Sequence, residues 1–248
     1  MPPSSRVLAI IPARGGSKGM PRKNLRLLGG EPLIVHTIRH AQQATQIDHI
    51  AVSTDDEEIA AVSRTTGADV IRRPAELATD TASSEASLLH ALDVLAREQW
   101  IRPELVVLLQ CTSPLRAPDD IDRAIATLRR QRADSLFSAC RSHAFVWRHT
   151  ARGPICLTYD FRRRKPRQQL PPAWVENGSI YLTTSAALRK SRNRLSGTIA
   201  VHEMSPLDSF QVDTEEDFAL IEQLWALRHR SHQETPRAAR RAVAQARS

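Results

Sequence analysis

A short apolar run that leads directly into a glycine-rich, cationic loop, within residues 7–24, constrains this chain more than any other feature. The run from Val7 to Ile11 contains no polar residue, which is typical of a strand buried on both faces in a parallel sheet. Glycines let backbone N–H groups approach a ligand closely, and clustered cations favour a polyanion such as a triphosphate. The segment therefore predicts a phosphate-binding loop after the first strand. Its glycines and cations are Gly15, Gly16, Gly19, Arg14, Lys18, Arg22 and Lys23.

This loop differs from the two common phosphate-binding motifs. No Gly-Lys-Ser/Thr closes a G-x-x-x-x-G frame, and the dinucleotide spacing G-x-G-x-x-G is missing as well. The cations lie within the glycine loop itself, as in nucleotidyltransferases that hold the pyrophosphate they later release. The alternative is a glycine-rich surface turn with scattered charge, which the strand immediately before the loop disfavours.

Composition and cysteine content are those of an ordinary globular protein. A chain of 248 residues can bury one α/β core, or a core with a small subdomain. No apolar run approaches the roughly 18 residues that span a bilayer, and the few residues before Val7 leave no room for a secretory signal. The three cysteines (Cys111, Cys140 and Cys156) show no C-x-x-C or metal-ligand spacing. We therefore expect a cytoplasmic protein with reduced thiols that does not contact a membrane.

The formal charge of +8 is concentrated near the C-terminus. Residues 228–248 hold six arginines and one glutamate, a net charge of +5, which leaves only +3 for residues 1–227. Because this segment is rich in Ala, Arg and Gln and lacks apolar periodicity, we expect a basic, disordered tail. A nucleic-acid-binding tail is the alternative, but we do not expect nucleic acid as a partner.

Strand-like and helical patterns alternate along the chain, which predicts a Rossmann-like, doubly wound and mostly parallel sheet within one domain, 1–227. Residues 141–175 interrupt the alternation with a basic run and several prolines, and predict a small inserted arm for dimerisation or substrate binding. Strands are expected at 7–11, 50–53, 70–71, 105–109, 135–140, 179–183 and 199–202. Helices are expected at 57–66, 83–97, 119–130 and 215–227.

Polar residues follow three of these strands at the point where each strand ends. Arg14 and the glycine loop follow the first strand, Arg73 follows 70–71, and residues 110–116 follow 105–109. Open α/β sheets bind ligands at the carboxyl ends of their strands. We therefore expect these segments to meet in one site.

Five segments of the chain carry a recognisable pattern: Ala13–Asn24, Arg73–Ser84, Leu109–Arg116, Pro166–Pro171 and Glu176–Tyr181. Together they resemble the acylneuraminate (sialic acid) cytidylyltransferases, over residues 7 to about 226. The resemblance implies a Rossmann-like dimer that uses Mg²⁺ and converts CTP and a nine-carbon keto-sugar acid, a nonulosonic acid, into the CMP-sugar and pyrophosphate.

The resemblance also implies roles for single residues. Arg14, Lys23 and Asp213 would be catalytic, the two cations holding the triphosphate. The nucleotide would be bound by Ala13, Gly15, Asn24, Arg73 and Ser84. The acceptor and ribose would be bound by Gln110, Thr112, Ser113, Arg167, Gln168, Asn177 and Tyr181.

The segment before the last helix departs from the family pattern. The family typically has Asp-x-Asp-Thr there, whereas this chain has Gln211 at the first position and Asp213 at the second. Asp213 with the CTP phosphates can suffice for Mg²⁺, but Gln211 cannot act as a general base. Deprotonation of the acceptor would then fall to Asp213, to a metal-bound water or to an unidentified neighbour, with Asp208 a weaker alternative.

Two alternatives stay open. In the first, the reaction is the same but the acceptor is pseudaminic, legionaminic or 3-deoxy-octulosonic acid, or a phosphonate. A non-catalytic nucleotide-binding protein is the other alternative, because Gln211 replaces a carboxylate.

Overall fold

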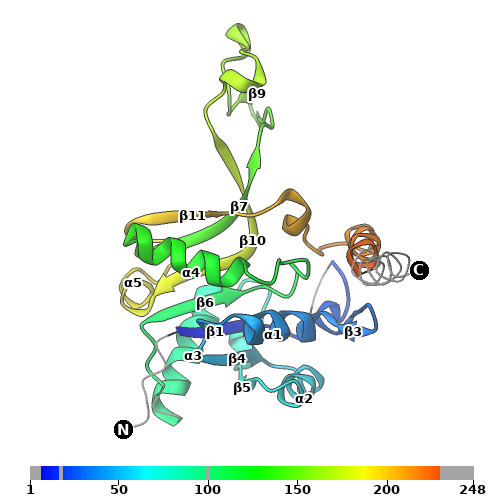
Figure 1. Ribbon diagram of the computed structural model, residues 1–248, viewed down its shortest axis with the longest axis vertical. Coiled ribbons are helices and arrows are strands. Elements are labelled where there is room, and N and C mark those ends of the chain that lie inside the picture. Colours follow the sequence, from blue (N-terminus) through cyan, green and yellow to red (C-terminus); the bar gives the residue numbers. More distant parts are fainter. Residues whose placement is uncertain (1–6, 17–18, 99–100, 230–248) are drawn as a thin grey trace, which may run out of the picture.

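A seven-stranded sheet organises the fold in the computed structural model, which describes residues 7–16, 19–98 and 101–229. β10 is antiparallel to β6 and β7, and every other pair of neighbouring strands is parallel. The sheet is therefore mostly parallel, as the alternating patterns predict. From edge to edge its strands are β11 (Ile199–Glu203), β7 (Ser135–Ser142), β10 (Ala173–Thr184), β6 (Leu105–Leu109), β1 (Val7–Pro12), β4 (His49–Thr54) and β5 (Asp69–Arg72) (Figure 1).

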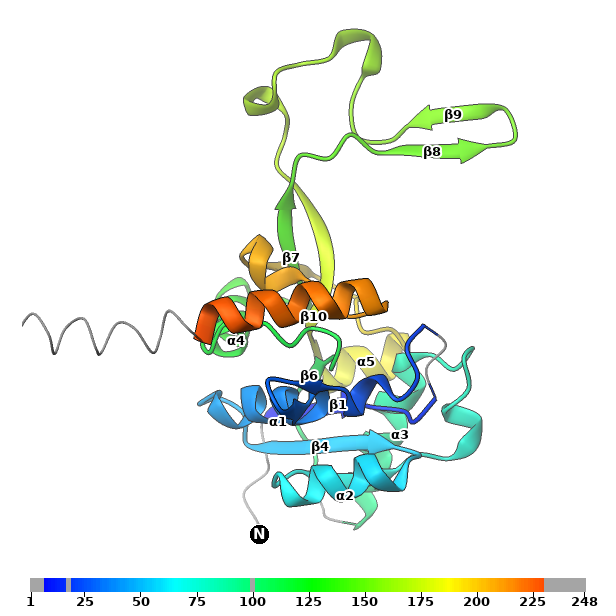
Figure 2. The same ribbon diagram turned by 90° about the vertical axis from the view of Figure 1, so that its right-hand side faces the viewer.

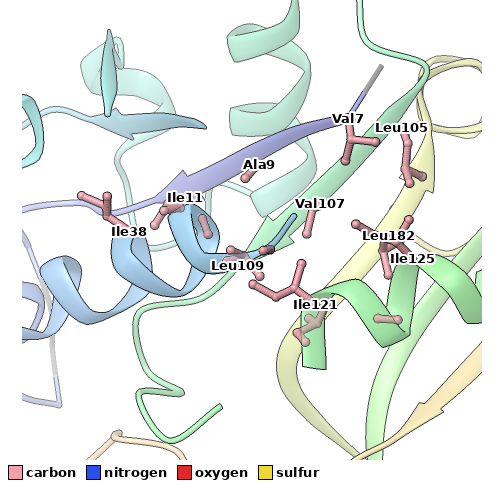
Figure 3. Packing of buried hydrophobic residues seen from close by; sticks show 14 of the residues in the cluster. Val7, Ala9, Ile11, Ile38, Leu105, Val107, Leu109, Ile121, Ile125 and Leu182 are labelled. Carbon is pink, nitrogen blue, oxygen red and sulfur yellow. The ribbon is translucent and has the colours of Figure 1, made fainter. Parts of the chain in front are cut away.

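Helices cover both faces of this sheet. Alternate residues of β1 enter two separate cores, because successive side chains of a strand point to opposite faces. Val7 and Ile11 pack with side chains of α1 and α4 in one core, shown in Figure 3. Leu8 and Ile10 pack with α3 and α5 in the other. The sheet is thus doubly wound, as predicted. The helices are α1 (Leu33–Gln43), α2 (Glu57–Thr65), α3 (Ser84–Glu98), α4 (Asp120–Gln131) and α5 (Ser185–Ser191).

The predicted insertion forms an arm that stands away from the body of the protein (Figure 2). Its stem consists of the ends of β7 and β10, so the strand expected at 179–183 is only the inner part of a twelve-residue strand. The other predicted strands agree with the structure to within two residues. Beyond the stem the arm holds β8 (Trp147–Thr150), β9 (Gly153–Cys156), η3 (Phe161–Arg163) and η4 (Arg167–Gln169).

The last helix runs from residue 215 to at least residue 229, two residues beyond the predicted boundary. Arg228 donates from Nη1 to the carbonyl oxygen of Leu115 at 2.6 Å and forms an ion pair with Asp208. Residues 230–248, and with them most of the predicted tail, lie outside the described residues. The remaining short elements are β2 (Leu27–Leu28), β3 (Glu31–Pro32), η1 (Lys23–Leu25), η2 (Ala75–Leu77) and η5 (Pro206–Ser209).

Candidate active site

A cavity of about 270 Å³ lies at the carboxyl ends of β1 and β6, where the sequence predicts the site. The glycine loop forms one wall, the segment from η2 to the start of α3 forms another, and the loop after β6 closes it. Seven of the predicted site residues line this cavity: Arg14, Lys23, Asn24, Arg73, Ser84, Gln110 and Thr112. The fold therefore brings together segments that are more than 80 residues apart.

The glycine loop is held in place by hydrogen bonds to its own backbone and to the end of β4. Asn24 donates from Nδ2 to the carbonyl oxygen of Arg14 at 3.0 Å. The N–H of Gly15 donates to Oδ1 of Asp55 at 3.1 Å, and a Cβ at Gly15 would lie 2.6 Å from Oδ2 of Asp56. Asn24 thus positions the loop, and position 15 requires a glycine because the chain passes so close to Asp56. Lys18 lies outside the described residues.

Lys23 connects the glycine loop to the segment that precedes the last helix. Its Nζ donates to the carbonyl oxygen of Val212 at 3.0 Å and to Oδ1 of Asp213 at 3.1 Å. The Lys23 side chain is 16% exposed and that of Asp213 is 63% exposed. Two predicted catalytic residues that are 190 positions apart in the sequence are therefore in direct contact.

Arg14 also lines the cavity and is held by the segment that follows η2. Its Nη1 lies 2.9 Å from Oδ1 of Asp80 and 3.4 Å from the carbonyl oxygen of Ala78. Both partners of the Arg14–Asp80 ion pair are partly exposed, and such pairs contribute about 0–1 kcal/mol. A triphosphate, which carries several charges, can therefore compete for this guanidinium at low cost.

Arg73 has a structural role as well as a place in the cavity wall. It is buried, and its Nε and Nη2 donate to Oγ and the carbonyl oxygen of Ser53, at 3.1 and 2.5 Å. Burial lowers the pKa of the guanidinium, and the neighbouring Asp55 opposes that shift. Arg73 therefore ties the end of β5 to β4 while its side chain borders the site.

Hydrogen bonds to the segment before the last helix and to β10 hold the loop after β6 in place. Gln110 and Thr112 line the cavity, whereas Ser113 is fully buried and its Oγ has no hydrogen-bond partner among the described residues. The carbonyl oxygen of Thr112 accepts from the N–H of Val212 at 2.8 Å. Arg116, which the sequence analysis did not assign, donates from Nη2 to the carbonyl oxygens of Gln110 and Ser179. Its place in the motif after β6 is the only sequence signal that points to it.

Two predicted acceptor residues are engaged in hydrogen bonds within the protein and do not line the cavity. Asn177 is buried, accepts from Oγ of Ser138 at 2.6 Å and donates to Oγ of Ser209 at 2.9 Å. The hydroxyl of Tyr181 donates to Glu176. In this structure both side chains stabilise the irregular part of β10.

Gly178 and Gln211 form a contact beside the cavity that the sequence analysis missed. Gly178 has a φ of +64°, in the left-handed region, and Gln211 donates from Nε2 to the carbonyl oxygen of Asn177. A Cβ at Gly178 would overlap Nε2 of Gln211 and would lie 2.9 Å from Oε1 of Gln110. The amides of Gln110 and Gln211 therefore both pack on the Gly178 backbone.

The last two predicted acceptor residues, Arg167 and Gln168, lie on the arm. They belong to the exposed η4 and do not line the cavity of their own chain. Figure 2 shows the arm rising beyond β7 and β10, with the β8–β9 hairpin well apart from β1 and β4.

Asp213 offers one carboxylate beside the glycine loop, a donor of the kind that divalent metal ions bind together with phosphate oxygens. Within residues 7–16, 19–98 and 101–229, no three His, Cys, Asp or Glu side chains gather as a metal site. Mg²⁺ commonly binds through one or two carboxylates together with phosphates and water, and Asp213 is exposed beside the phosphate-binding loop. Asp217 fixes this turn by accepting from the N–H groups of Thr214 and Asp213, which lowers the pKa of its carboxyl.

Several known proteins are similar to this chain in sequence. The family model described as Cytidylyltransferase matches residues 8–155. The CMP-N,N'-diacetyllegionaminic acid synthase of Legionella pneumophila is 34% identical over 236 residues, which cover 90% of this chain and 97% of that protein. The N-acylneuraminate cytidylyltransferase of Oncorhynchus mykiss is 35% identical over 223 residues, 88% of this chain and 50% of that protein.

The chain belongs to the acylneuraminate cytidylyltransferase family. It spans about half the length of the fish relatives that it matches. The fold is also that of the cytidylyltransferases of known structure. A CMP:2-keto-3-deoxy-manno-octonic acid synthetase complexed with CTP superimposes with a TM-score of 0.67 at 18% identity, over 90% of this chain and 100% of that chain. No helix among the described residues is long and apolar enough to cross a membrane.

Proposed function

We propose that this acylneuraminate cytidylyltransferase family member transfers the cytidylyl group of CTP to a nonulosonic acid and releases pyrophosphate. The observation that carries the proposal is the contact of Lys23 with Asp213 at the mouth of a cavity that Arg14 also lines. Arg14 and Lys23 each have a carboxylate partner, Asp80 and Asp213, and they border a space that is also lined by small polar groups such as Ser84. A pocket of that kind suits a triphosphate and a pyrimidine better than a purine.

In the proposed reaction the anomeric hydroxyl of the sugar acid attacks the α-phosphorus of CTP in line with the leaving pyrophosphate. A new oxygen–phosphorus bond forms, the bond to the β-phosphate oxygen breaks, and the hydroxyl proton passes to a base. Arg14 and Lys23 would neutralise charge on the phosphates, so the protein contributes mainly positioning and electrostatics. Gln211 cannot accept the proton, because its amide is neutral and donates to Asn177. Asp80 lines the cavity but is paired with Arg14, so we assign the proton to Asp213, whose carboxylate contacts Lys23.

We propose Mg²⁺ as the metal and Asp213 as the residue that holds it. When bound, the ion would supply charge neutralisation at the phosphates. Lys23 would then exchange Asp213 for phosphate oxygen, and this exchange costs little because Asp213 is largely exposed.

Two copies of the chain are needed if Arg167 and Gln168 bind the acceptor, because neither residue lines the cavity of its own chain. We therefore propose a homodimer in which the arm of one subunit supplies these residues to the other. Residues 141–175 carry eight arginine or lysine residues and one acidic residue, which suits an anionic acceptor. The arm also exposes Trp147 and Ile155, apolar surface that a partner would cover.

Mixing two inactive variants tests this arrangement. Lys23→Ala removes the phosphate contact and Arg167→Ala removes the arm contact, so each homodimer should be inactive. A mixed dimer would contain one site with both residues intact, and exchange of subunits should restore activity. If mixing restores none although subunits exchange, the arm does not serve the partner's site.

The acceptor is tested by pyrophosphate release from CTP and Mg²⁺ with a panel of acids. N-acetylneuraminic acid is the expected substrate, with legionaminic, pseudaminic and 3-deoxy-octulosonic acids and a phosphonate as comparisons. Release with another acid alone would keep the reaction and change the acceptor. CTP binding without release from any acceptor would support the non-catalytic alternative. We place the protein in the cytoplasm, which its three free cysteines support.

A further inference from the structure

A second cavity, of about 610 Å³, lies apart from the nucleotide cavity. It is enclosed by α1, by residues 114–118 after β6 and by the last helix, and it shares no described lining residue with the first cavity. Its size is in the range of sites for small organic ligands. Neither the proposed reaction nor the comparisons assign it a role.

The cavity is bordered by a buried cation, Arg116, that forms no ion pair with any residue that the structure describes. Arg116 is 3% exposed, and its Nη2 donates to two backbone carbonyl oxygens, of Gln110 and Ser179. Its Nε and Nη1 have no hydrogen-bond partner among the described residues. The charge of Asp120 acts on Arg116, but this carboxylate is bonded to Arg123 and to the N–H of Ala117. A buried charge without a counter-ion is costly, so a nearby anion would be stabilising.

The remaining charges around the cavity compensate one another. Arg39 forms an ion pair with Glu31, and Arg228 forms one with Asp208. The fifth charged side chain is Arg116, so the lining has a net charge of +1 when its histidines are neutral. Burial, with Arg116 next in importance, lowers the pKa of His40 to about 3, so His40 adds no charge near neutral pH. The net positive potential of the cavity therefore originates at Arg116.

The other walls are apolar and aromatic. Pro114, Leu115 and Pro118 line one side, and Trp225 lines the other, stacked on His229 with ring centroids 3.7 Å apart. A fully hydrated inorganic ion would leave this surface uncovered, whereas an anion with a flat apolar part would cover it. We propose that this cavity is a second ligand site, which binds a small organic anion, a carboxylate or a phosphate monoester attached to an apolar group.

Two matched probes test the proposal on the full chain. Benzoate and phenyl phosphate share one ring and differ in the anion, and benzyl alcohol is the neutral control. Binding is measured by calorimetry with excess inorganic pyrophosphate, which fills the phosphate-binding loop and leaves the second cavity open. At least one anionic probe should bind in the millimolar range or tighter, at one site per chain, while benzyl alcohol should bind at least about ten times more weakly. Which probe binds more tightly distinguishes a carboxylate site from a phosphate site.

Two substitutions at the mouth of the cavity have opposite expected signs. Arg39→Gln removes a positive charge and Glu31→Gln removes a negative one, and both side chains are at least a third exposed, so the fold should persist. By Coulomb's law, a unit charge about 6–8 Å from the ligand changes its affinity by about threefold at the dielectric constant of bulk water and by about 30- to 100-fold at the effective value of about 20 near a protein surface, so we expect a change of at least about threefold. Arg39→Gln should weaken the anionic probe by that factor and Glu31→Gln should strengthen it. Arg130→Gln, at an exposed position of α4 outside the lining, is the control and should change nothing.

The proposal is overturned if neither anion binds, if benzyl alcohol binds as tightly as the anions, or if the two mouth variants shift affinity in the same direction. Failure of nucleotidyl transfer would not affect it, because no CTP or sugar is present in the assay. If thermal melting shows that Arg39→Gln folds poorly, the Glu31→Gln variant alone tests the proposal: it should bind the anionic probe more tightly than the wild type, and unchanged or weaker binding overturns the proposal.

Discussion

Gly178→Ala should damage the active site as well as the fold. Two side-chain amides, those of Gln110 and Gln211, pack on the Gly178 backbone, and a Cβ would overlap the second and crowd the first. Both contacting atoms are at the ends of flexible side chains. They can therefore rotate away, but Gln110 would leave its place in the nucleotide cavity, and Gln211 would lose its hydrogen bond to Asn177.

The expected stability cost has two parts. Holding alanine at a φ of +64° costs about 1–2 kcal/mol, and loss of the Gln211 hydrogen bond costs about 0.5–1.5 kcal/mol. The sum is about 1.5–3.5 kcal/mol. Gly30→Ala is the matched control, because Gly30 also has a positive φ, +88°, but a Cβ there meets nothing within 4 Å. It should show the backbone cost alone and leave the KM for CTP unchanged.

Urea unfolding and steady-state pyrophosphate release measure the two effects on the same samples. Gly178→Ala should raise the KM for CTP or lower kcat by at least about tenfold, a loss of about 1.4 kcal/mol. Adding Gln211→Ala should cost little further stability, since the hydrogen bond from Gln211 to Asn177 is already lost in Gly178→Ala. If Gly178→Ala and Gly30→Ala are equal in both assays, the two amides do not pack on Gly178.

Three further predictions concern single side chains. Lys23→Met should lower kcat/KM by at least about 100-fold in pyrophosphate release, because one lost contact to developing charge costs about 3 kcal/mol. Its melting temperature should fall only modestly, since Asp213, the partner in the lost ion pair, is 63% exposed and stays hydrated. Burial lowers the pKa of His40 to about 3, whereas the unfolded group titrates near 6.5, so the stability that neutral His40 provides above pH 6.5 is lost as the pH falls. Between pH 7 and 5 that loss is about 2 kcal/mol in urea unfolding, and His40→Leu should abolish it. Arg73→Lys should lower the free energy of unfolding by about 1–3 kcal/mol, because lysine cannot reproduce the two bonds to Ser53.

The parallel sheet and the edge that carries the site were predictable from the sequence because both follow from local patterns. The apolar runs of β1 and β6 leave few alternatives to central strands, and polar residues that follow parallel strands gather at one edge. Arg14, Arg73 and Gln110 line one cavity for that reason. The strand pattern predicts where the site lies, whereas the reaction and the roles of single residues came from the family resemblance.

Contacts between distant segments were not predictable in the same way. Nothing in the sequence around Lys23 specifies that its ammonium reaches the Val212 carbonyl oxygen, and no motif shows that Gln211 packs on Gly178. The position of Arg167 depends on the length and direction of the arm, which are set by how far β7 and β10 stay paired beyond the sheet. Register and reach of this kind depend on tertiary packing and leave no local sequence signal.

The measurement that tests the central claim most directly is a mass-spectrometric product analysis of a reaction with CTP, Mg²⁺ and N-acetylneuraminic acid. The account predicts one CMP-linked sugar for each pyrophosphate released, and neither product when Lys23→Met replaces the wild type. CTP binding without any CMP-conjugate, from this acid or from the other acids of the panel, would contradict it.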